Sequence, residues 1–170
     1  MYEQERQAII DYARSQIGAA KADHPRVQAY WADCLKGGLP PKGYVKSWCG
    51  GFVLHCLRTV LGIEDQWRDG RGFIYQSITK GKTVKTPQVG DIVHYPTRHQ
   101  HYALVADVRP DGLVTIDGNS LHSSAGTGVW EHTKTWALLK AQGAVYFTIE
   151  PFLQDQAKTN PMNPRIVDEH

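Results

Sequence analysis

Apolar residues recur at helical spacing in three segments of the chain. The first is Glu3–Ile17, where apolar positions repeat with a period near 3.6 and a glycine follows. The second is Pro25–Leu35, which opens with a residue suited to a helix start and carries an i, i+3, i+4, i+7 apolar stripe. The third starts near Cys49, after a loop rich in glycine and proline, and runs to Leu61, with Gly62 as its C-terminal cap. We therefore expect three helices in the first part of the chain.

The pattern changes to one of β-strands in the second half of the chain. Five apolar segments are bounded by glycine, proline, aspartate or asparagine, and they are Asp91–Tyr95, His101–Val108, Gly112–Asn119, Gly128–His132 and Ala144–Ile149. The turn Arg109–Gly112 has proline and glycine where a hairpin can use them. Helices followed by an antiparallel sheet predict an α+β fold.

Length and composition suit one globular domain. The chain has 170 residues, of which 41% are hydrophobic and 21% charged. We assign residues 1–153 to a single domain whose first 43 residues are its helical N-terminal part. Residues 154–170 contain two prolines and many polar side chains, so we expect a polar tail that wraps the surface or is disordered.

Charge and hydropathy exclude several classes of protein. Mean hydropathy is −0.43 and no apolar run approaches the length of a membrane span, so we expect no membrane insertion. The net charge of +2 comes from scattered side chains without a basic stripe, so we expect no nucleic-acid partner. The segment Met1–Ile10 has no apolar core of a signal peptide. We therefore expect synthesis in the cytoplasm and, for a target outside it, delivery by another route.

Cys49 is the candidate nucleophile among three cysteines. It stands at the predicted start of the third helix, where unpaired N–H groups and the helix dipole favour an anion such as a thiolate. Cys56 lies two turns inside the same helix and gains little from this effect. Three widely spaced cysteines do not suggest a disulfide framework. We interpret Cys34 and Cys56 as small buried apolar residues.

His101 is the candidate base, because it opens an apolar strand that would fix its ring while leaving it accessible. An unperturbed imidazole can take and return a proton near neutral pH. If the next strand pairs through the predicted hairpin, Asp117 and Asn119 return to the end of the sheet where His101 begins. Either residue could accept the ring N–H of His101, and the residues alone leave both open.

These residues fall within motifs that resemble those of the CHAP and NlpC/P60 peptidases. Ser47–Val53 resembles their Trp-Cys-x-x-Phe-Val nucleophile motif, and Gly90–Val93 resembles the strand before their histidine. His101–Val105 resembles His-x-Gly-Ile-Val, and Asp117–Ser120 resembles the Glu-Gly-Asn segment of CHAP domains. Two positions depart from the pattern, since Ala103 replaces the usual glycine and Asp117 is one methylene shorter than glutamate. The order and spacing match over residues 47–120, somewhat under half of the chain.

The resemblance implies a papain-like fold, with the nucleophile at the start of a central helix packed on an antiparallel sheet. It also implies a cysteine amidase or endopeptidase that acts on peptidoglycan peptides and needs no cofactor or metal. Cys49 would be the nucleophile and His101 the base, with Asn119 favoured over Asp117 as the residue that orients His101. Trp48 adjoins the nucleophile, so we expect it to form a wall of the substrate cleft.

Two alternatives stay open at this point. The same residues could serve a hydrolase or acyltransferase that acts on another amide, or an inactive module that binds cell wall or is part of a larger assembly. A zinc site is disfavoured, because His94, His99 and His101 crowd together without a recognised ligand motif, and 94–100 looks like a polar hairpin loop.

Missing secretion signals fit both a phage lysin and a delivered antibacterial toxin, and a toxin would be expected to have an immunity protein as partner.

Overall fold

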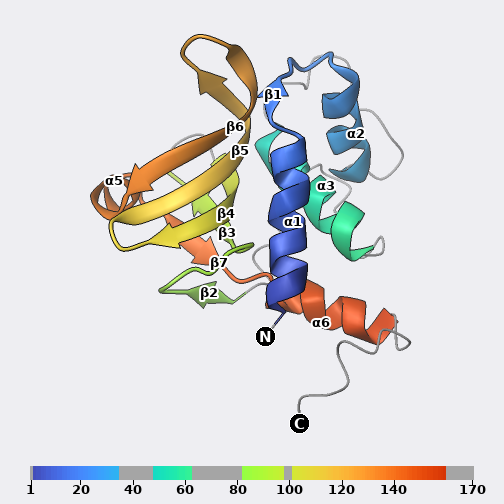
Figure 1. The fold of residues 1–170 in the computed structure, drawn as a ribbon, viewed down its shortest axis with the longest axis vertical. Coiled ribbons are helices and arrows are strands. Elements are labelled where there is room, and N and C mark those ends of the chain that lie inside the picture. The colour runs from blue at the N-terminus through green and yellow to red at the C-terminus, as the bar shows by residue number, and fades with distance from the viewer. Residues whose placement is uncertain (1, 35–47, 63–81, 98–100, 160–170) are drawn as a thin grey trace.

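The helices of the molecule lie mainly on one side of a sheet (Figure 1). The computed structural model describes residues 2–34, 48–62, 82–97 and 101–159, with the side chains of 33–34 and 155–159 left aside. In chain order, the helices within this part are α1 (Glu3–Ser15), α2 (Pro25–Cys34), α3 (Cys49–Leu61), α5 (Trp136–Ala141) and α6 (Glu150–Thr159).

One sheet of seven strands, every neighbouring pair antiparallel, forms the other layer. Its strands are β1 (Gly18–Ala19), β2 (Thr83–Val84), β3 (Ile92–Tyr95), β4 (His101–Arg109), β5 (Gly112–His122), β6 (Gly126–Thr135) and β7 (Val145–Phe147). They are arranged in the order β1-β6-β5-β4-β3-β7-β2. The edges are therefore the two-residue strands β1 and β2, and the long strands β4 and β5 are central.

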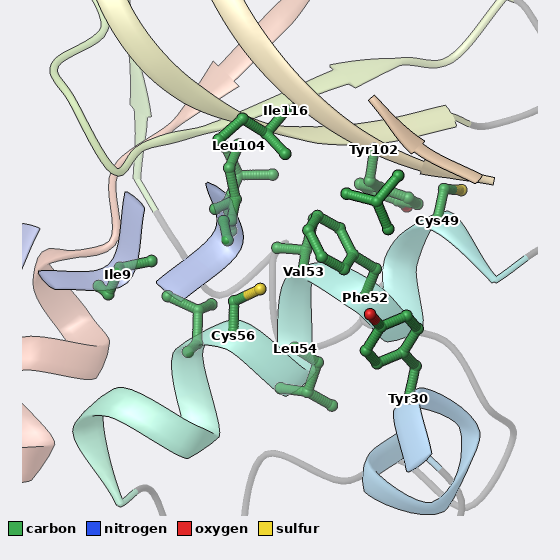
Figure 2. Close-up of a cluster of buried hydrophobic side chains, with 14 of the residues drawn as sticks. Ile9, Tyr30, Cys49, Phe52, Val53, Leu54, Cys56, Tyr102, Leu104 and Ile116 are labelled. Carbon is green, nitrogen blue, oxygen red and sulfur yellow. The ribbon is translucent and has the colours of Figure 1, made fainter. Parts of the chain in front are cut away.

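Helix α3 lies in the centre of the core. Its residues Phe52, Val53 and Leu57 are fully buried, and Figure 2 shows α3 packed beneath strand residues of β4 and β5, with Tyr30 of α2 on its other side. The helix ends at Gly62, whose left-handed backbone (φ 62°) lets its N–H donate to the Arg58 carbonyl. An apolar helix flanked by other helices and a sheet is held on several sides, which fixes the position of its first turn.

A second, smaller apolar cluster covers the other face of the sheet. Side chains alternate along β4, so Tyr102 and Leu104 join the helix side whereas Ala103 and Val105 point to the opposite side. There Ala103 and Val105 belong to one cluster with Leu139 of the short helix α5. Burial on both faces of β4 fixes its register, because a shift by one residue would exchange the two sets.

A buried ion pair joins the N-terminal helix to the sheet. The guanidinium of Arg6 in α1 lies 2.6 Å from a carboxylate oxygen of Asp91, just before β3, and also donates to the Val89 carbonyl. Asp91 in turn accepts the backbone N–H groups of Gln88 and Ile149. Both charges are almost wholly buried, so these hydrogen bonds compensate for the water that the charges lose.

The α+β expectation is confirmed, and several details differ from it. Helix α6 continues to Thr159 and so includes the first residues of the tail expected from residue 154, with Pro151 in the first turn that tolerates proline; residues 160–170 lie outside the described part. The predicted loop at 94–100 is also wrong at His94, which is a buried residue of β3 stacked on Tyr102. Strands β1 and β2 and helix α5 were not expected.

No helix within the described ranges has the length and apolar character needed to span a membrane.

Candidate active site

The thiol of Cys49 lies at the first residue of α3, at the end of the helix that meets the sheet (Figure 2). Trp48 precedes it as the N-cap and provides no side-chain cap, and the first helical hydrogen bond runs from the Phe52 N–H to the Trp48 carbonyl. The N–H groups of the first turn have no partner inside the helix and together favour a negative charge. Cys49 is buried, with 2% of its surface exposed, which limits access of bulk water to the sulfur.

The imidazole of His101 is held between Cys49 and Asp117. His101 is the first residue of β4, and its Nε2 lies 2.7 Å from Oδ2 of Asp117 on β5. The thiol of Cys49 is the second hydrogen-bonding partner of the ring, which leaves Nδ1 for the sulfur. A quarter of the His101 side chain remains exposed. The ring thus connects the thiol with the carboxylate.

The pKa of His101 is the result of opposing effects. Burial lowers the pKa of the ring, but the hydrogen bonds to Asp117 and Cys49 and the negative charges of both groups raise it, and the net result is a pKa of about 9. His101 is therefore protonated at neutral pH. An imidazolium next to a thiol favours the thiolate form of that thiol.

Asp117 is a fully charged carboxylate in a buried position. Burial alone would raise its pKa, but the hydrogen bond from His101, the charge of Lys134 and the hydrogen bond from Thr115 hold the pKa far below its usual value. Thr115 donates to Oδ1 at 2.5 Å, and Lys134 Nζ donates to Oδ2 at 3.1 Å. Three donors on one carboxylate fix both its charge and its orientation.

The sequence offered two candidates, Asp117 and Asn119, for the residue that orients His101, and Asn119 was favoured. In the structure Asp117 makes the 2.7 Å hydrogen bond. Asn119 has a left-handed backbone (φ 53°) at an irregularity where the β5–β6 register shifts between Asp117 and Ser120. This conformation suits asparagine better than most residues, and alternation along a regular strand could not have predicted it.

Gly118 allows the helix and the strand to approach each other. A methyl carbon in place of its hydrogen would lie 2.6 Å from Cβ of Phe52, in the first turn of α3. That distance is too short for two carbon atoms, so any larger residue would push α3 away from β5. The glycine therefore brings the helix that carries Cys49 close to the strand that carries Asp117.

Trp48 does not have the position expected for the wall of a cleft. Only 1% of its surface is exposed, and its ring packs at 5.7 Å against that of Tyr30. A tryptophan next to a helix start can face the core or the solvent, and the sequence pattern did not distinguish the two. In this structure Trp48 supports the start of α3 from inside the core.

Sequence reasoning missed three residues that shape the site: Thr115, Gly118 and Lys134. The signal for Thr115 was its spacing of two from Asp117, which places both on one face of β5. Lys134 lies on β6 and reaches Asp117 along the sheet, a contact that no local spacing reveals. Cys56 is buried, as expected, and forms no disulfide within the described residues, whereas the side chain of Cys34 and all of His99 lie outside the described residues.

The histidines noted in the sequence do not gather into a metal-binding cluster within the described part of the chain. Among the residues that the structure describes, no group of three or more histidine, cysteine, aspartate or glutamate side chains could hold a metal ion. His94, for example, packs inside the sheet against Tyr102, at a ring-centroid distance of 4.3 Å.

The comparison with known families agrees with this geometry. Residues 40–119 match the family model of the CHAP domain. This segment is a CHAP domain. CHAP domains are a papain-like amidase family related to NlpC/P60, and the helices packed on an antiparallel sheet agree with the fold of that family. No curated protein and no solved structure matches the chain.

The CHAP match contains all the polar residues proposed from the sequence for catalysis, and it ends at Asn119. Membership of this family indicates a cysteine hydrolase that acts on peptidoglycan. Helices α1 and α2 and the strand β6, which carries Lys134, lie outside the matched segment.

Proposed function

We propose that this protein is a cysteine hydrolase that cleaves amide bonds in the peptide part of peptidoglycan, as an amidase or an endopeptidase. Cys49 is the nucleophile, His101 the acid and base, and Asp117 the residue that orients His101. The observation that carries the proposal is the single ring of His101, hydrogen-bonded to the thiol at a helix start and to a buried carboxylate. This arrangement supplies a nucleophile and a proton donor together.

Acylation uses the charged pair. The thiolate of Cys49 attacks the amide carbonyl, and the carbonyl oxygen becomes an oxyanion in the tetrahedral intermediate. The backbone N–H of Cys49, at the start of α3, is the oxyanion donor that we propose. The imidazolium of His101 then gives its proton to the nitrogen of the leaving amine. The C–N bond breaks, the free amine departs, and a thioester on Cys49 remains with a neutral imidazole.

Deacylation returns the enzyme to its starting state. Neutral His101 takes a proton from a water molecule, and the resulting hydroxide attacks the thioester carbonyl. The C–S bond breaks, the carboxylic acid product leaves, and the thiolate is again paired with the imidazolium. Asp117 stabilises the charged ring and keeps one nitrogen directed at the sulfur during both steps.

The proposed setting is the bacterial cell wall, reached after delivery or lysis. The weakly positive net charge of +2 is compatible with an anionic polymer. A phage lysin and a secreted antibacterial effector would use the same site, and the effector would require an immunity protein in the producing cell. The substrate is the peptidoglycan peptide in both settings.

The test compares three proteins on purified peptidoglycan: the parent, Cys49→Ala and Cys56→Ala. Cys56 is the matched control, since it lies in the same helix and is also buried. New amino groups and soluble fragments are identified by mass spectrometry, which also gives the bond that is cut. We expect cleavage by the parent and by Cys56→Ala, and none above background by Cys49→Ala.

Two other results would change the assignment. Cleavage by Cys49→Ala at the parent rate would remove Cys49 as the nucleophile. If the parent released nothing while Cys49 reacted normally with iodoacetamide, the wall substrate would be wrong and other amides, or transfer to an amine acceptor, would be assayed. A parent without activity and without a reactive thiol would be an inactive binding module.

A further inference from the structure

The carboxylate of Asp117 has two cationic partners on the same oxygen atom. Oδ2 accepts from Nε2 of His101 at 2.7 Å and from Nζ of Lys134 at 3.1 Å. The other oxygen, Oδ1, accepts from Thr115. The two cations therefore lie no further apart than these two hydrogen bonds allow, and each weakens the hold of Asp117 on the other.

Lys134 is held in this position by a second contact. Its Nζ lies 3.0 Å from the hydroxyl of Tyr95 and 4.6 Å from the centroid of the same ring. Only 14% of the Lys134 side chain is exposed, although lysine usually keeps its ammonium group in water. The ring of Tyr95 also stacks on His101, with centroids 5.9 Å apart. Tyr95 thus contacts both cations that share Asp117.

The titratable groups around this carboxylate come from five elements packed together. In α3, β3, β4, β5 and β6 they are Cys49, His94, Tyr95, His101, Asp117, His132 and Lys134. Burial lowers the pKa of His94 and His132, and burial with the nearby carboxylate raises that of Tyr95. These three are accordingly neutral near pH 7, and Lys134 is the fixed positive charge beside the pair formed by His101 and Asp117.

We propose that Lys134 is a positioning residue that shares the Asp117 carboxylate with His101 and so limits how tightly the imidazolium proton is held. The inference rests on the proposed function, in which His101 must be protonated for acylation and neutral for deacylation. Asp117 alone would favour the charged ring during acylation and also during deacylation. A neighbouring ammonium group opposes that preference and eases release of the proton.

The test measures the titration of His101 directly, so it does not depend on any substrate. Ring signals of labelled histidine are followed by NMR against pH in Cys49→Ala and in Cys49→Ala/Lys134→Met, with a His101→Gln spectrum for assignment. We expect loss of the lysine charge to raise the pKa of His101 by about one unit. Lys134→Arg, which keeps the charge, should show a shift less than half as large.

An unchanged His101 titration in folded Cys49→Ala/Lys134→Met would overturn the inference, and so would equal shifts in the methionine and arginine variants. If the methionine variant does not fold, Lys134→Gln in the same background gives the same comparison with a polar side chain. Tyr95→Phe provides an independent check, because it keeps the charge of Lys134 and removes only its hydroxyl partner. We expect Tyr95→Phe to raise the pKa of His101 by less than Lys134→Met does. An unchanged pKa would count against the positioning role of Lys134.

Activity provides a second readout that separates the two proposals. If the parent cleaves peptidoglycan, the alkaline limb of its kcat/KM profile should move to higher pH in Lys134→Met, by the same amount as the His101 pKa. If no substrate is cleaved, the NMR result still decides the role of Lys134. Failure of the proposed function and failure of this inference are therefore observed in different experiments.

Discussion

At the scale of the residue, the proton on His101 connects the features of the site. Burial disfavours a charged imidazole, yet Asp117 and Cys49 together raise its pKa to about 9. The carboxylate can do this because Thr115 and Lys134 keep it charged in a buried position. A ring with that pKa is an effective proton donor to an amine leaving group at neutral pH.

Replacing Asp117 by asparagine should lower the pKa of His101, because burial of the ring would then be opposed mainly by Cys49. We expect kcat/KM at neutral pH to fall on the order of 100-fold, with the alkaline limb of the profile moved to lower pH. Asn119→Gly is the matched control, since glycine keeps the left-handed backbone of that position. A larger shift of this limb in Asn119→Gly than in Asp117→Asn would assign the orienting role to Asn119.

Stability should also depend on pH through His101. Its pKa is raised from 6.5 in the unfolded chain to about 9 in the folded protein. The contribution to stability is therefore fully present below pH 6.5 and is lost as the pH rises through about 9. Urea unfolding of the parent at pH 6 and pH 9.5 should show a larger loss of stability than His101→Gln shows over the same interval. Equal losses would mean that other groups cause the dependence.

The chemistry of single residues could be read from the sequence only where it is local. Cys49 and His101 stand at the ends of elements that periodicity predicts, so their placement was foreseen. The contact of Lys134 with Asp117 requires the pairing of β5 with β6 and a long side chain running along the sheet. The orientation of Trp48 was missed for a similar reason, because its environment is made by Tyr30 from another helix.

At the scale of the element, the contact between α3 and β5 determines the distance across the site. Gly118 is the point of closest approach, where an added methyl carbon would lie 2.6 Å from Cβ of Phe52. A Cβ atom is part of the helix framework and cannot rotate away. Relief of the clash must therefore come from movement of the first turn of α3 and of β5 relative to each other.

We expect Gly118→Ala to destabilise the protein by about 1–3 kcal/mol in urea unfolding and to lower kcat/KM by about tenfold or more, because Cys49 moves relative to His101. Gly62→Ala is the matched control at the other end of the same helix, where nothing obstructs a methyl group and only the left-handed backbone is strained. It should cost about 1 kcal/mol and leave kcat/KM unchanged. Full activity in Gly118→Ala would show that the site tolerates displacement of α3.

Elements long enough for the apolar pattern to repeat several times were predicted well, and short elements were not. The helix from Cys49 to Leu61 and strand β4 agree with their predicted bounds within one residue, and β5 continues three residues past its predicted end at Asn119. Strands β1 and β2 have two residues each and α5 has six, too few for a period to be visible. They form because neighbouring strands and the second apolar cluster stabilise them.

At the scale of the whole molecule, the N-terminal helix belongs to the same folded unit as the site. Arg6 of α1 is paired with Asp91 in a nearly water-free position and also contacts the carbonyl of Val89. Asp91 connects onward to the backbone of Ile149, close to the start of α6. The ion pair thereby joins segments from the beginning, middle and end of the described chain.

Removing one partner of this ion pair should destabilise the folded protein, because the charge of the other partner would stay buried without compensation. We expect Arg6→Met to lower the free energy of unfolding by about 3–5 kcal/mol, measured by urea denaturation. The double variant Arg6→Met/Asp91→Asn removes both charges and should recover part of that loss. Arg14→Met is the control, since its ion pair with Glu131 is solvent-exposed on both sides and should contribute less than 1 kcal/mol.

The two-residue edge strands have a consequence for association between molecules. An exposed edge with many free backbone N–H and C=O groups can act as a template for a strand of another molecule and so start aggregation. The sheet here ends in β1 on one side and β2 on the other. The long strands β4 and β5 lie inside the sheet, whereas β6 (Gly126–Thr135) pairs with β1 only at Gly128 and Val129. Strand addition at the β2 edge would gain only a few hydrogen bonds, whereas residues 130–135 of β6 have no β1 partner, so any assembly by β-pairing in concentrated solutions should begin beside β6.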